Sequence, residues 1–283
     1  MRIALVQQAA GPDRDANLER CLAAIDRAAG HGADLVAFAE LARERFFPQR
    51  RDRGDLAHAL AEPIPGPTTE RLAERARENG SVVVFNMYEE AAGGGRSGEA
   101  RTVRRYDASP VIDADGSLLG VTRMVHVAQF EGFWEQEYYD EGDRGAPVYD
   151  TAAGRVGVAI CYDRHYPEYM RALGAAGAEL VVIPQAGAVG EWPEGLFEAE
   201  VRTAAFQNGY WAALCNRVGG EERLTFAGES FVVDPEGQVA ARAAQGEEEL
   251  LIADIDLDAV ARSTARKYFW RDRRPELYGD WLG

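Results

Sequence analysis

The chain has 283 residues, a formal net charge of −16 and 46% apolar residues, so a large core can form without disulfides or structural metals. The acidic charge gives the electrostatic field the wrong sign for binding phosphates, which excludes nucleic acids and anionic membranes as main partners. No window approaches the roughly 18 consecutive apolar residues of a membrane span. Three scattered cysteines are too few for a disulfide framework, and we therefore expect a reducing cytoplasm.

Buried strands and helices alternate along the first third of the chain. Apolar runs bounded by turn residues predict strands over 2–8, 33–40 and 81–88. Helical spacing predicts one helix over 17–29, with Asn17 as a possible cap and Gly30 as the stop, and another over 68–79, stopped by Gly80. The glycine-rich stretch 91–98 is predicted to be a flexible tip.

Hairpins interrupt this alternation in the rest of the chain. They are predicted over 108–124, with Asp115–Gly116 as the turn, and over 228–241. Further strands are expected over 155–161, 179–184, 210–217 and 250–257, and helices over 167–178 and 196–207. Two sheets packed face to face, with helices on their outer faces, accommodate both patterns and predict an α/β fold. Because no linker or repeat of ~20–50 residues is present, we expect a single domain over 1–283.

Three acidic or thiol residues stand where a reactive group would lie. Glu40 and Cys161 each end a predicted buried strand, and strand ends gather catalytic groups in layered α/β folds. Glu135 lies in the aromatic segment FEGFWEQEYYDEG, which can desolvate its carboxylate. A carboxylate beside a thiol can take its proton, so that the thiolate attacks an electrophilic carbon and the acid protonates the leaving amine. A second carboxylate can help to activate water, and backbone N–H groups or a cation can stabilise the oxyanion.

Each of these residues also has a structural interpretation. A cysteine after an apolar run is often a small core residue, and Cys21 and Cys215 are interpreted in that way. A glutamate at a strand end is commonly solvated or paired. Of the four histidines, His126 and His165 are first interpreted as structural hydrogen-bonding groups. Since no two histidines show ligand spacing and neither HExxH nor GxSxG occurs, we expect no metal centre and no serine-hydrolase elbow.

The combined pattern resembles the nitrilase, or carbon–nitrogen hydrolase, superfamily over nearly the whole chain. ADLVAFAEL is similar to the segment with the family's glutamate base, ICYDRHYPE to the nucleophile segment, and GFWEQEYYDEGD to the loop with the second glutamate. IDADGSLLG, GAELVVIPQA, LCNRVG and SFVVDPEG follow in the family's order and spacing. CYDRHYP, YYDEGDRGAPVYDT, EVRTAAFQNGYW and RRPELY are most similar to N-carbamoyl amidases, especially β-ureidopropionase-like ones.

The resemblance implies an α-β-β-α sandwich that dimerises through helices into an extended sandwich. It implies hydrolysis of a non-peptide C–N bond through an acyl-enzyme on Cys161, with Glu40 and Glu135 as catalytic carboxylates and no metal or organic cofactor. The backbone N–H of Tyr162 would bind the oxyanion.

The resemblance also suggests the substrate. Arg164 would hold a substrate carboxylate as a bidentate fork, and His165 matches the β-ureidopropionase-like pattern. A salt bridge from Arg164 to a surface acid is the alternative. The expected substrate is an N-carbamoyl amino acid or a small amide.

One position departs from the family pattern. In Thr122-Arg123-Met124-Val125-His126, Met124 stands where the family has a lysine that supplies a cation near the oxyanion, and the only lysine in the chain is Lys267. Loss of one oxyanion donor typically lowers the rate ~10²–10³-fold. Strand alternation would direct Arg123 away from this face and place His126 on it, which makes His126 a candidate substitute and substrate-binding group.

Two functions therefore stay open. The leading hypothesis is a cysteine-dependent amidohydrolase with an altered oxyanion site. The alternative is a homologue, impaired naturally or by engineering, that binds its ligand without efficient turnover. The basic, aromatic tail within 263–283 predicts either an arm packed on a partner subunit, in a homodimer or higher homo-oligomer, or a segment packed on its own domain.

Overall fold

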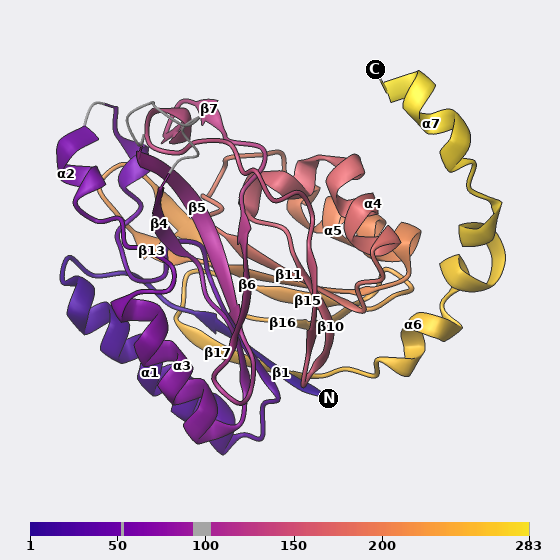
Figure 1. Ribbon diagram of the computed structural model, residues 1–283, viewed down its shortest axis with the longest axis horizontal. Helices are drawn as coiled ribbons and strands as arrows, with labels where there is room; N and C mark the ends of the chain where they lie inside the picture. Colours follow the sequence, from indigo (N-terminus) through magenta and orange to yellow (C-terminus); the bar gives the residue numbers. More distant parts are fainter. Residues whose placement is uncertain (52–53, 93–102, 283) are drawn as a thin grey trace.

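Two β-sheets lie face to face at the centre of the computed structural model, and helices flank them (Figure 1). The structure describes residues 1–51, 54–92 and 103–282. The first sheet has the strand order β17-β1-β2-β3-β5-β4, with β6 paired to β5. Its strands are β1 (Arg2–Gln7), β2 (Leu35–Phe38), β3 (Val82–Val84), β4 (Met87–Ala92), β5 (Val103–Ile112), β6 (Leu118–Arg123) and β17 (Glu249–Asp254).

The second sheet has the strand order β16-β15-β12-β11-β10-β9. Its strands are β9 (Val148–Thr151), β10 (Gly154–Val158), β11 (Leu180–Gln185), β12 (Trp211–Asn216), β15 (Phe231–Val233) and β16 (Val239–Arg242). Strands β10, β11 and β12 are parallel to one another, as are β1, β2 and β3 in the first sheet. Each sheet therefore presents a row of carboxyl-terminal strand ends, where side chains from segments distant in sequence can meet.

Helices cover the outer face of each sheet. The apolar faces of α1 (Arg14–Gly30) and α3 (Pro67–Asn79) pack on the first sheet, and those of α4 (Pro167–Ala175) and α5 (Leu196–Asn208) pack on the second. This arrangement confirms the predicted four-layer α-β-β-α sandwich. Short elements at its edges are α2 (Gly54–His58), β7 (Gln129–Phe130), β8 (Phe133–Trp134), β13 (Val218–Gly220) and β14 (Thr225–Ala227).

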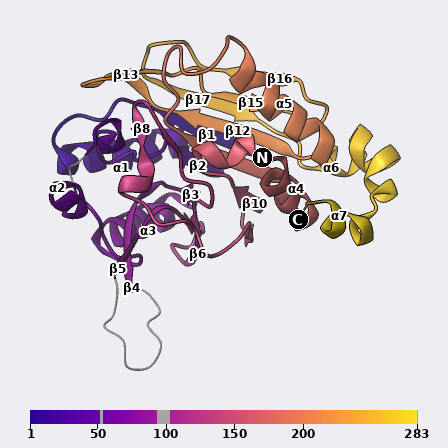
Figure 2. The same ribbon diagram turned by 90° about the horizontal axis from the view of Figure 1, so that it is seen from above.

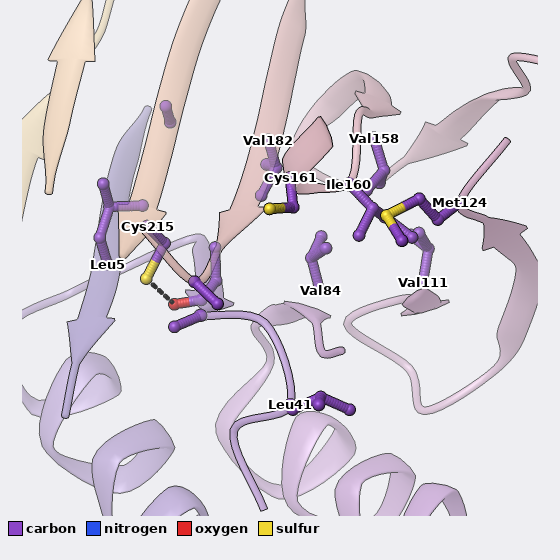
Figure 3. Close-up of a cluster of buried hydrophobic side chains, with 14 of the residues drawn as sticks. Leu5, Leu41, Val84, Val111, Met124, Val158, Ile160, Cys161, Val182 and Cys215 are labelled. Carbon is purple, nitrogen blue, oxygen red and sulfur yellow. Dashed lines mark hydrogen bonds between the residues drawn. The ribbon is translucent and has the colours of Figure 1, made fainter. Parts of the chain in front are cut away.

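Apolar side chains from both sheets form the core between them (Figure 3). The thiol of Cys215, on β12, donates to the carbonyl oxygens of Val6 and Ala37 on the first sheet, at 3.4 and 3.5 Å. Cys21 is buried on the inner face of α1. Both cysteines are therefore core residues, as the sequence predicts. Among the described residues, none of the helices combines the length and apolar composition needed to cross a membrane.

The chain leaves the two sheets after β17. The helices α6 (Asp258–Arg262) and α7 (Pro275–Leu282) lie in a segment that extends along one side of the sandwich, and α7 projects away from its body (Figures 1 and 2). Tyr268 and Phe269 in this segment are 66% and 36% exposed.

Two local predictions need correction. Helix α1 begins before Asn17, because Asp13 is its cap and accepts hydrogen bonds from the amides of residues 15 and 16. The Asn17 side chain instead bonds to the backbone of Gly11 and Arg43. The strand predicted over 81–88 is two strands, β3 and β4, because the polar Asn86 lies at the break between them. The predicted flexible tip at 91–98 lies outside the described residues from 93 onward.

A buried arginine fixes the segment that follows β2. Arg217 comes directly after β12 and is 1% exposed. Its guanidinium donates to the backbone carbonyl oxygens of Glu40, Leu41 and Glu44 at 2.8, 2.6 and 2.9 Å, and to the carboxylate of Glu221. These bonds tie the end of the second sheet to the backbone that bears the Glu40 side chain.

Replacing Arg217 by methionine is expected to lower the free energy of unfolding by about 3–5 kcal/mol, because Glu221 and three carbonyl groups would lose their buried partner. Urea unfolding measures this loss. Arg223 is exposed and provides the matched control, so Arg223→Met should change stability by less than about 0.5 kcal/mol. Equal effects of the two substitutions would contradict the assigned role of Arg217.

Candidate active site

Glu40 lies two residues beyond the end of β2. Its side chain is completely buried, and neither carboxylate oxygen has a hydrogen-bond donor among the described polar groups. The next residue, Leu41, has a φ of 47°, and its amide donates to Asn86 Oδ1 at 2.6 Å. This turn and the Arg217 bonds hold the Glu40 carboxyl in an apolar environment.

Cys161 begins the short 3₁₀ helix η3 (Cys161–His165), three residues after β10 ends. Its φ of 43° is in the left-handed region, which costs a residue with a side chain on the order of 1–2 kcal/mol. Such strain persists only where the surrounding structure enforces it, and it is frequent at functional sites. The Sγ atom accepts a hydrogen bond from Gln185 Nε2 at 3.3 Å, and its side chain is nearly inaccessible to solvent.

Glu135 begins the short 3₁₀ helix η2 (Glu135–Glu137), in the segment after β8. Its side chain is fully buried within the core cluster that contains Phe133, Tyr138 and Tyr139. The Oε2 atom accepts from the amide of Ala128 at 3.1 Å, whereas Oε1 has no partner among the described residues. The aromatic segment thus surrounds the carboxylate, as its sequence suggests.

The structure brings these three residues together from separate parts of the chain. A carboxylate oxygen of Glu40, a carboxylate oxygen of Glu135 and the sulfur of Cys161 all lie within 4.8 Å of one another. Against the larger effect of burial, which raises the pKa of Glu40, the proximity of the Cys161 thiol lowers it. The geometry therefore permits proton transfer from sulfur to a buried carboxylate, followed by attack of the thiolate on an electrophilic carbon.

Burial is the main cause of the perturbed proton affinities in this cluster. It raises the pKa of Glu40, and the neighbouring Asp107 and Glu135 raise it further. Burial also raises the pKa of the Cys161 thiol, and Glu40 and Glu135 add to that increase. Raised pKa values on both groups keep the thiol protonated and disfavour a second negative charge in the site, so the thiolate forms only as its proton moves to an ionised carboxylate.

Asp107, on β5, is a further buried acid that sequence reasoning missed. Its Oδ1 accepts from Asn86 Nδ2 at 2.5 Å, while Oδ2 and the Glu40 oxygens are all acceptors when both groups are ionised. A proton on either acid allows a hydrogen bond between them. Burial raises the pKa of Asp107 from 3.8 to about 7.

Met124 lies directly after β6 and is 1% exposed (Figure 3). Its side chain belongs to the same apolar cluster as Val111, Ile160 and Cys161. Its amide donates to the carbonyl oxygen of Asp107 at 2.9 Å. Met124 therefore places an apolar side chain where a cation is expected. It lies next to β5, the strand that bears the carboxyl group of Asp107.

The neighbouring Arg123 does not replace that cation. Its guanidinium forms two hydrogen bonds with Glu89, at 2.6 and 2.7 Å, and one with Asp143 at 2.8 Å. These contacts place its charge in an ion pair separate from the Glu40–Cys161 site, as strand alternation predicts.

The alternation argument fails for His126, because β6 ends at Arg123. The His126 ring stacks on Tyr166, with ring centroids 3.5 Å apart, and its Nδ1 lies 2.8 Å from Asp163 Oδ1. Asp163 also accepts from the amides of Val125 and His126. These bonds join the segment after Met124 to the helix that begins at Cys161.

Arg164 and His165 lie in the same 3₁₀ helix as Cys161. Arg164 is 4% exposed, and its Nη1 donates to the carbonyl oxygen of Cys161 and to Gln185 Oε1, both at 2.9 Å. Its Nε lies 3.4 Å from Glu200, and His165 Nδ1 lies 2.8 Å from the other oxygen of that carboxylate. The structure therefore gives Arg164 structural partners at the nucleophile, and its binding of a substrate carboxylate stays a prediction.

Gln185 is the second contributor that sequence reasoning missed. It is fully buried at the carboxyl end of β11, where it donates to the Cys161 sulfur and accepts from Arg164. Its place at the end of a buried parallel strand is the same signal that drew attention to Glu40 and Cys161. The predicted role of the Tyr162 amide fits its position in the first turn of η3, where backbone N–H groups lack an intrahelical acceptor.

The fold and the site together define a hydrolase of the cysteine type. The chain belongs to the carbon–nitrogen hydrolase family, whose pattern it matches over residues 2–265. It is a carbon–nitrogen hydrolase that acts on non-peptide C–N bonds.

Individual relatives agree with this assignment. The sequence is 32% identical to N-carbamoylputrescine amidase from Solanum lycopersicum, over 98% of this chain and 93% of that protein. The fold superposes on a carbon–nitrogen hydrolase from Helicobacter pylori G27 with a TM-score of 0.89 and 27% identity, covering 100% and 98% of the two chains. It superposes on an amidase from Nesterenkonia sp. AN1 with a TM-score of 0.78 and 28% identity, covering 100% of each chain. In that amidase structure, acrylamide has added to the active-site cysteine.

Replacing Asp107 by asparagine is expected to make stability less dependent on pH. The folded chain holds a proton on Asp107 up to about pH 7, whereas the unfolded chain releases it near pH 3.8, so the stability of the unmodified protein falls as the pH rises between these values. The amide does not titrate, so the substitution should remove up to about 1.4 kcal/mol of this loss per pH unit. Urea unfolding at several pH values, with a chelator in the buffer, measures the difference.

The exposed carboxylate of Asp150 provides the control, because Asp150→Asn removes an acid of similar chemistry outside the site. Its unfolding curves should keep the pH dependence of the unmodified protein. Parallel pH dependence for Asp107→Asn and the unmodified protein would contradict proton binding by Asp107 in the folded state.

Proposed function

We propose that this hydrolase cleaves the C–N bond of an N-carbamoyl compound or a small amide through an acyl-enzyme on Cys161. The observation that carries the proposal is the convergence of Glu40, Glu135 and Cys161 within 4.8 Å in a buried site. The strained φ of Cys161 and the hydrogen bond from Gln185 support it, because both fix the direction of the sulfur.

In the proposed reaction, Glu40 takes the thiol proton while the sulfur attacks the carbonyl carbon. The C–N bond then breaks, and the leaving nitrogen takes the proton from Glu40. Water attacks the resulting acyl-enzyme, a carboxylate accepts one water proton, and the carbon–sulfur bond breaks. The sulfur regains a proton, so the enzyme returns to its starting state without any change in oxidation state.

The described residues of the site lack the cation that is expected to stabilise the oxyanion. The backbone N–H of Tyr162 is the proposed donor, and Met124 contributes neither a charge nor a hydrogen bond where a cation is expected. Removal of one oxyanion donor typically lowers the rate ~10²–10³-fold. A catalytically impaired protein that binds its ligand is therefore the second candidate, and the burial of the uncharged Met124 in the same apolar cluster as Cys161 is the observation that favours it.

The charges near the nucleophile bear on the substrate. Arg164 is the predicted carboxylate-binding group, but its charge already faces Glu200. Burial and the nearer acids raise the pKa of Cys161 and Glu135 most, and Glu191 raises both further, whereas Arg164 lowers the pKa of Cys161. We propose that this negative field favours substrates with an ammonium group over substrates with a carboxylate. N-carbamoylputrescine, which gives the Solanum lycopersicum relative its name, carries such an ammonium group.

Replacing Met124 by lysine is expected to raise kcat/KM for N-carbamoyl substrates about 10²–10³-fold, because it adds the missing oxyanion donor. Ammonia release from N-carbamoyl-β-alanine, N-carbamoylputrescine and simple amides measures turnover. Intact mass spectrometry of the unmodified protein after exposure to substrate should show an adduct on Cys161 even where turnover is slow.

Met124→Leu is the matched control, because it repacks the site without adding a charge, and it should leave kcat/KM within a few-fold of the unmodified protein. Activity only in Met124→Lys, with no adduct on unmodified Cys161, would establish the impaired alternative. No activity and no adduct in either protein would overturn the proposed reaction.

We further propose that the protein forms a homodimer or a higher homo-oligomer in the cytoplasm. The exposed Tyr268 and the projecting helix α7 support a tail that packs on a second copy, although Phe269 already packs on Phe206 of α5 (Figure 1). A buried and unpaired state for all three cysteines supports a reducing compartment.

Truncation before Ser263 is expected to weaken the oligomer, because it removes this exposed aromatic surface. Light scattering coupled to size-exclusion chromatography measures the assembly. A truncated chain that keeps both its fold, by circular dichroism, and its oligomeric state would show that the tail packs on its own subunit.

A further inference from the structure

The buried cluster at the nucleophile also has the donor set of a metal site. Among the described residues, Glu40, Glu135 and Cys161 form a group whose ligand atoms lie within 4.8 Å of one another. A sulfur and two carboxylate oxygens are ligands that Zn²⁺ accepts. These donors come from three segments that are distant in sequence. A search for closely spaced histidines or an HExxH motif therefore does not find them.

No cation neutralises the acids of this cluster. Among the described residues, Glu40, Asp107 and Glu135 take part in no ion pair, and Met124 is apolar. Arg123 forms ion pairs with Glu89 and Asp143. The Arg164 guanidinium donates to the Cys161 carbonyl and Gln185 and forms an ion pair with Glu200. Charge balance in a dry site then requires either bound protons or a bound cation.

The unpartnered oxygen atoms point to a ligand. Both carboxylate oxygens of Glu40, which is 0% exposed, lack a hydrogen-bond partner, as does Oε1 of the equally buried Glu135. Zn–S and Zn–O bonds of about 2.3 and 2.0 Å place tetrahedral ligands roughly 3.5 Å apart. Because the donors lie within 4.8 Å of one another, they need to approach by at most roughly 1 Å, and the unpartnered oxygens can do so without breaking a hydrogen bond of their own.

We propose that Glu40, Glu135 and Cys161 bind a divalent, thiophilic cation of the Zn²⁺ class, which blocks the nucleophile while it is bound. The metal–sulfur and metal–oxygen bonds form as the thiol, and any glutamate that holds a proton, release these protons to solvent, and no group is oxidised or reduced. Gln185 Nε2 donates to the metal-bound sulfur from outside the coordination shell. Hard cations such as Mg²⁺ are poor occupants, because they prefer oxygen ligands alone and retain water.

The blocking effect rests on the proposed function, whereas the binding itself does not. Equilibrium dialysis of the full chain against Zn²⁺, followed by elemental analysis, should show one more tightly bound zinc per chain than in Cys161→Ser. Co²⁺ should produce a sulfur-to-metal charge-transfer band that Cys161→Ser abolishes. Cys21→Ser, which changes a cysteine outside the cluster, should keep this band.

Two variants at one position test the charge argument. Met124→Lys adds a cation beside the cluster and should weaken Zn²⁺ binding by about tenfold or more through repulsion. Met124→Leu, which changes packing alone, should retain the affinity of the unmodified protein. Mg²⁺ in place of Zn²⁺ should not protect the protein against thermal unfolding, whereas Zn²⁺ should raise its Tm.

Equal zinc content in the unmodified protein and Cys161→Ser, or a cobalt band that survives in Cys161→Ser, would overturn the proposed site. Unchanged affinity in Met124→Lys would overturn its explanation by the missing cation. Stoichiometric zinc binding by a protein that shows no amidase activity even in its metal-free form would refute the proposed function and leave the site standing. Amidase activity that Zn²⁺ does not inhibit, in a protein that binds no zinc, would refute the site alone.

Discussion

A thiol and three carboxyl groups lie in one water-poor site, and no ammonium or guanidinium group of the described residues forms an ion pair with the three acids. Burial penalises every charge in that site, and each additional negative charge raises the proton affinity of the others. The thiol therefore rests neutral, and the reaction starts from the form in which the Glu40 carboxyl beside it is ionised. Reactivity depends on moving a single proton between Cys161 and Glu40, because that transfer changes the position of the charge without changing the total.

The backbone keeps these mutually repelling groups together. Cys161 and Leu41 both have left-handed backbone conformations, and neither is a glycine, so the surrounding structure must enforce them. Arg217 enforces one turn through bonds to three carbonyl groups. Asp163 enforces the other, because it joins the start of η3 to the segment after β6. The two sheets thus act as fixed supports whose strand ends face each other across the site.

Local patterns in the sequence predict most of the fold and the three central site residues. Apolar periodicity and the glycine and proline boundaries predict the layers, and Glu40 and Cys161 are detectable because each follows a buried strand. The missed features depend on contacts between segments distant in sequence. Asp107 lies within β5 and resembles any polar residue of a strand until Asn86 and Glu40 meet it in space. Asn17 has the residue type of a cap, but Asp13 lies earlier and makes the capping bonds, so the local signal was ambiguous.

The position of Met124 changes what kind of charge the site accepts. A lysine there would give the cluster a permanent positive charge, which favours a thiolate and repels external cations. Methionine leaves the field of the acids uncompensated, and this field is the basis of the proposed preference for a cationic substrate over a carboxylate. The strained Cys161, the Gln185 amide and the buried glutamates still hold the geometry of a nucleophile. Backbone strain and buried acids are costly to maintain at one point. Their presence therefore favours a site that still binds and reacts with a ligand, rather than a pocket that has lost its function.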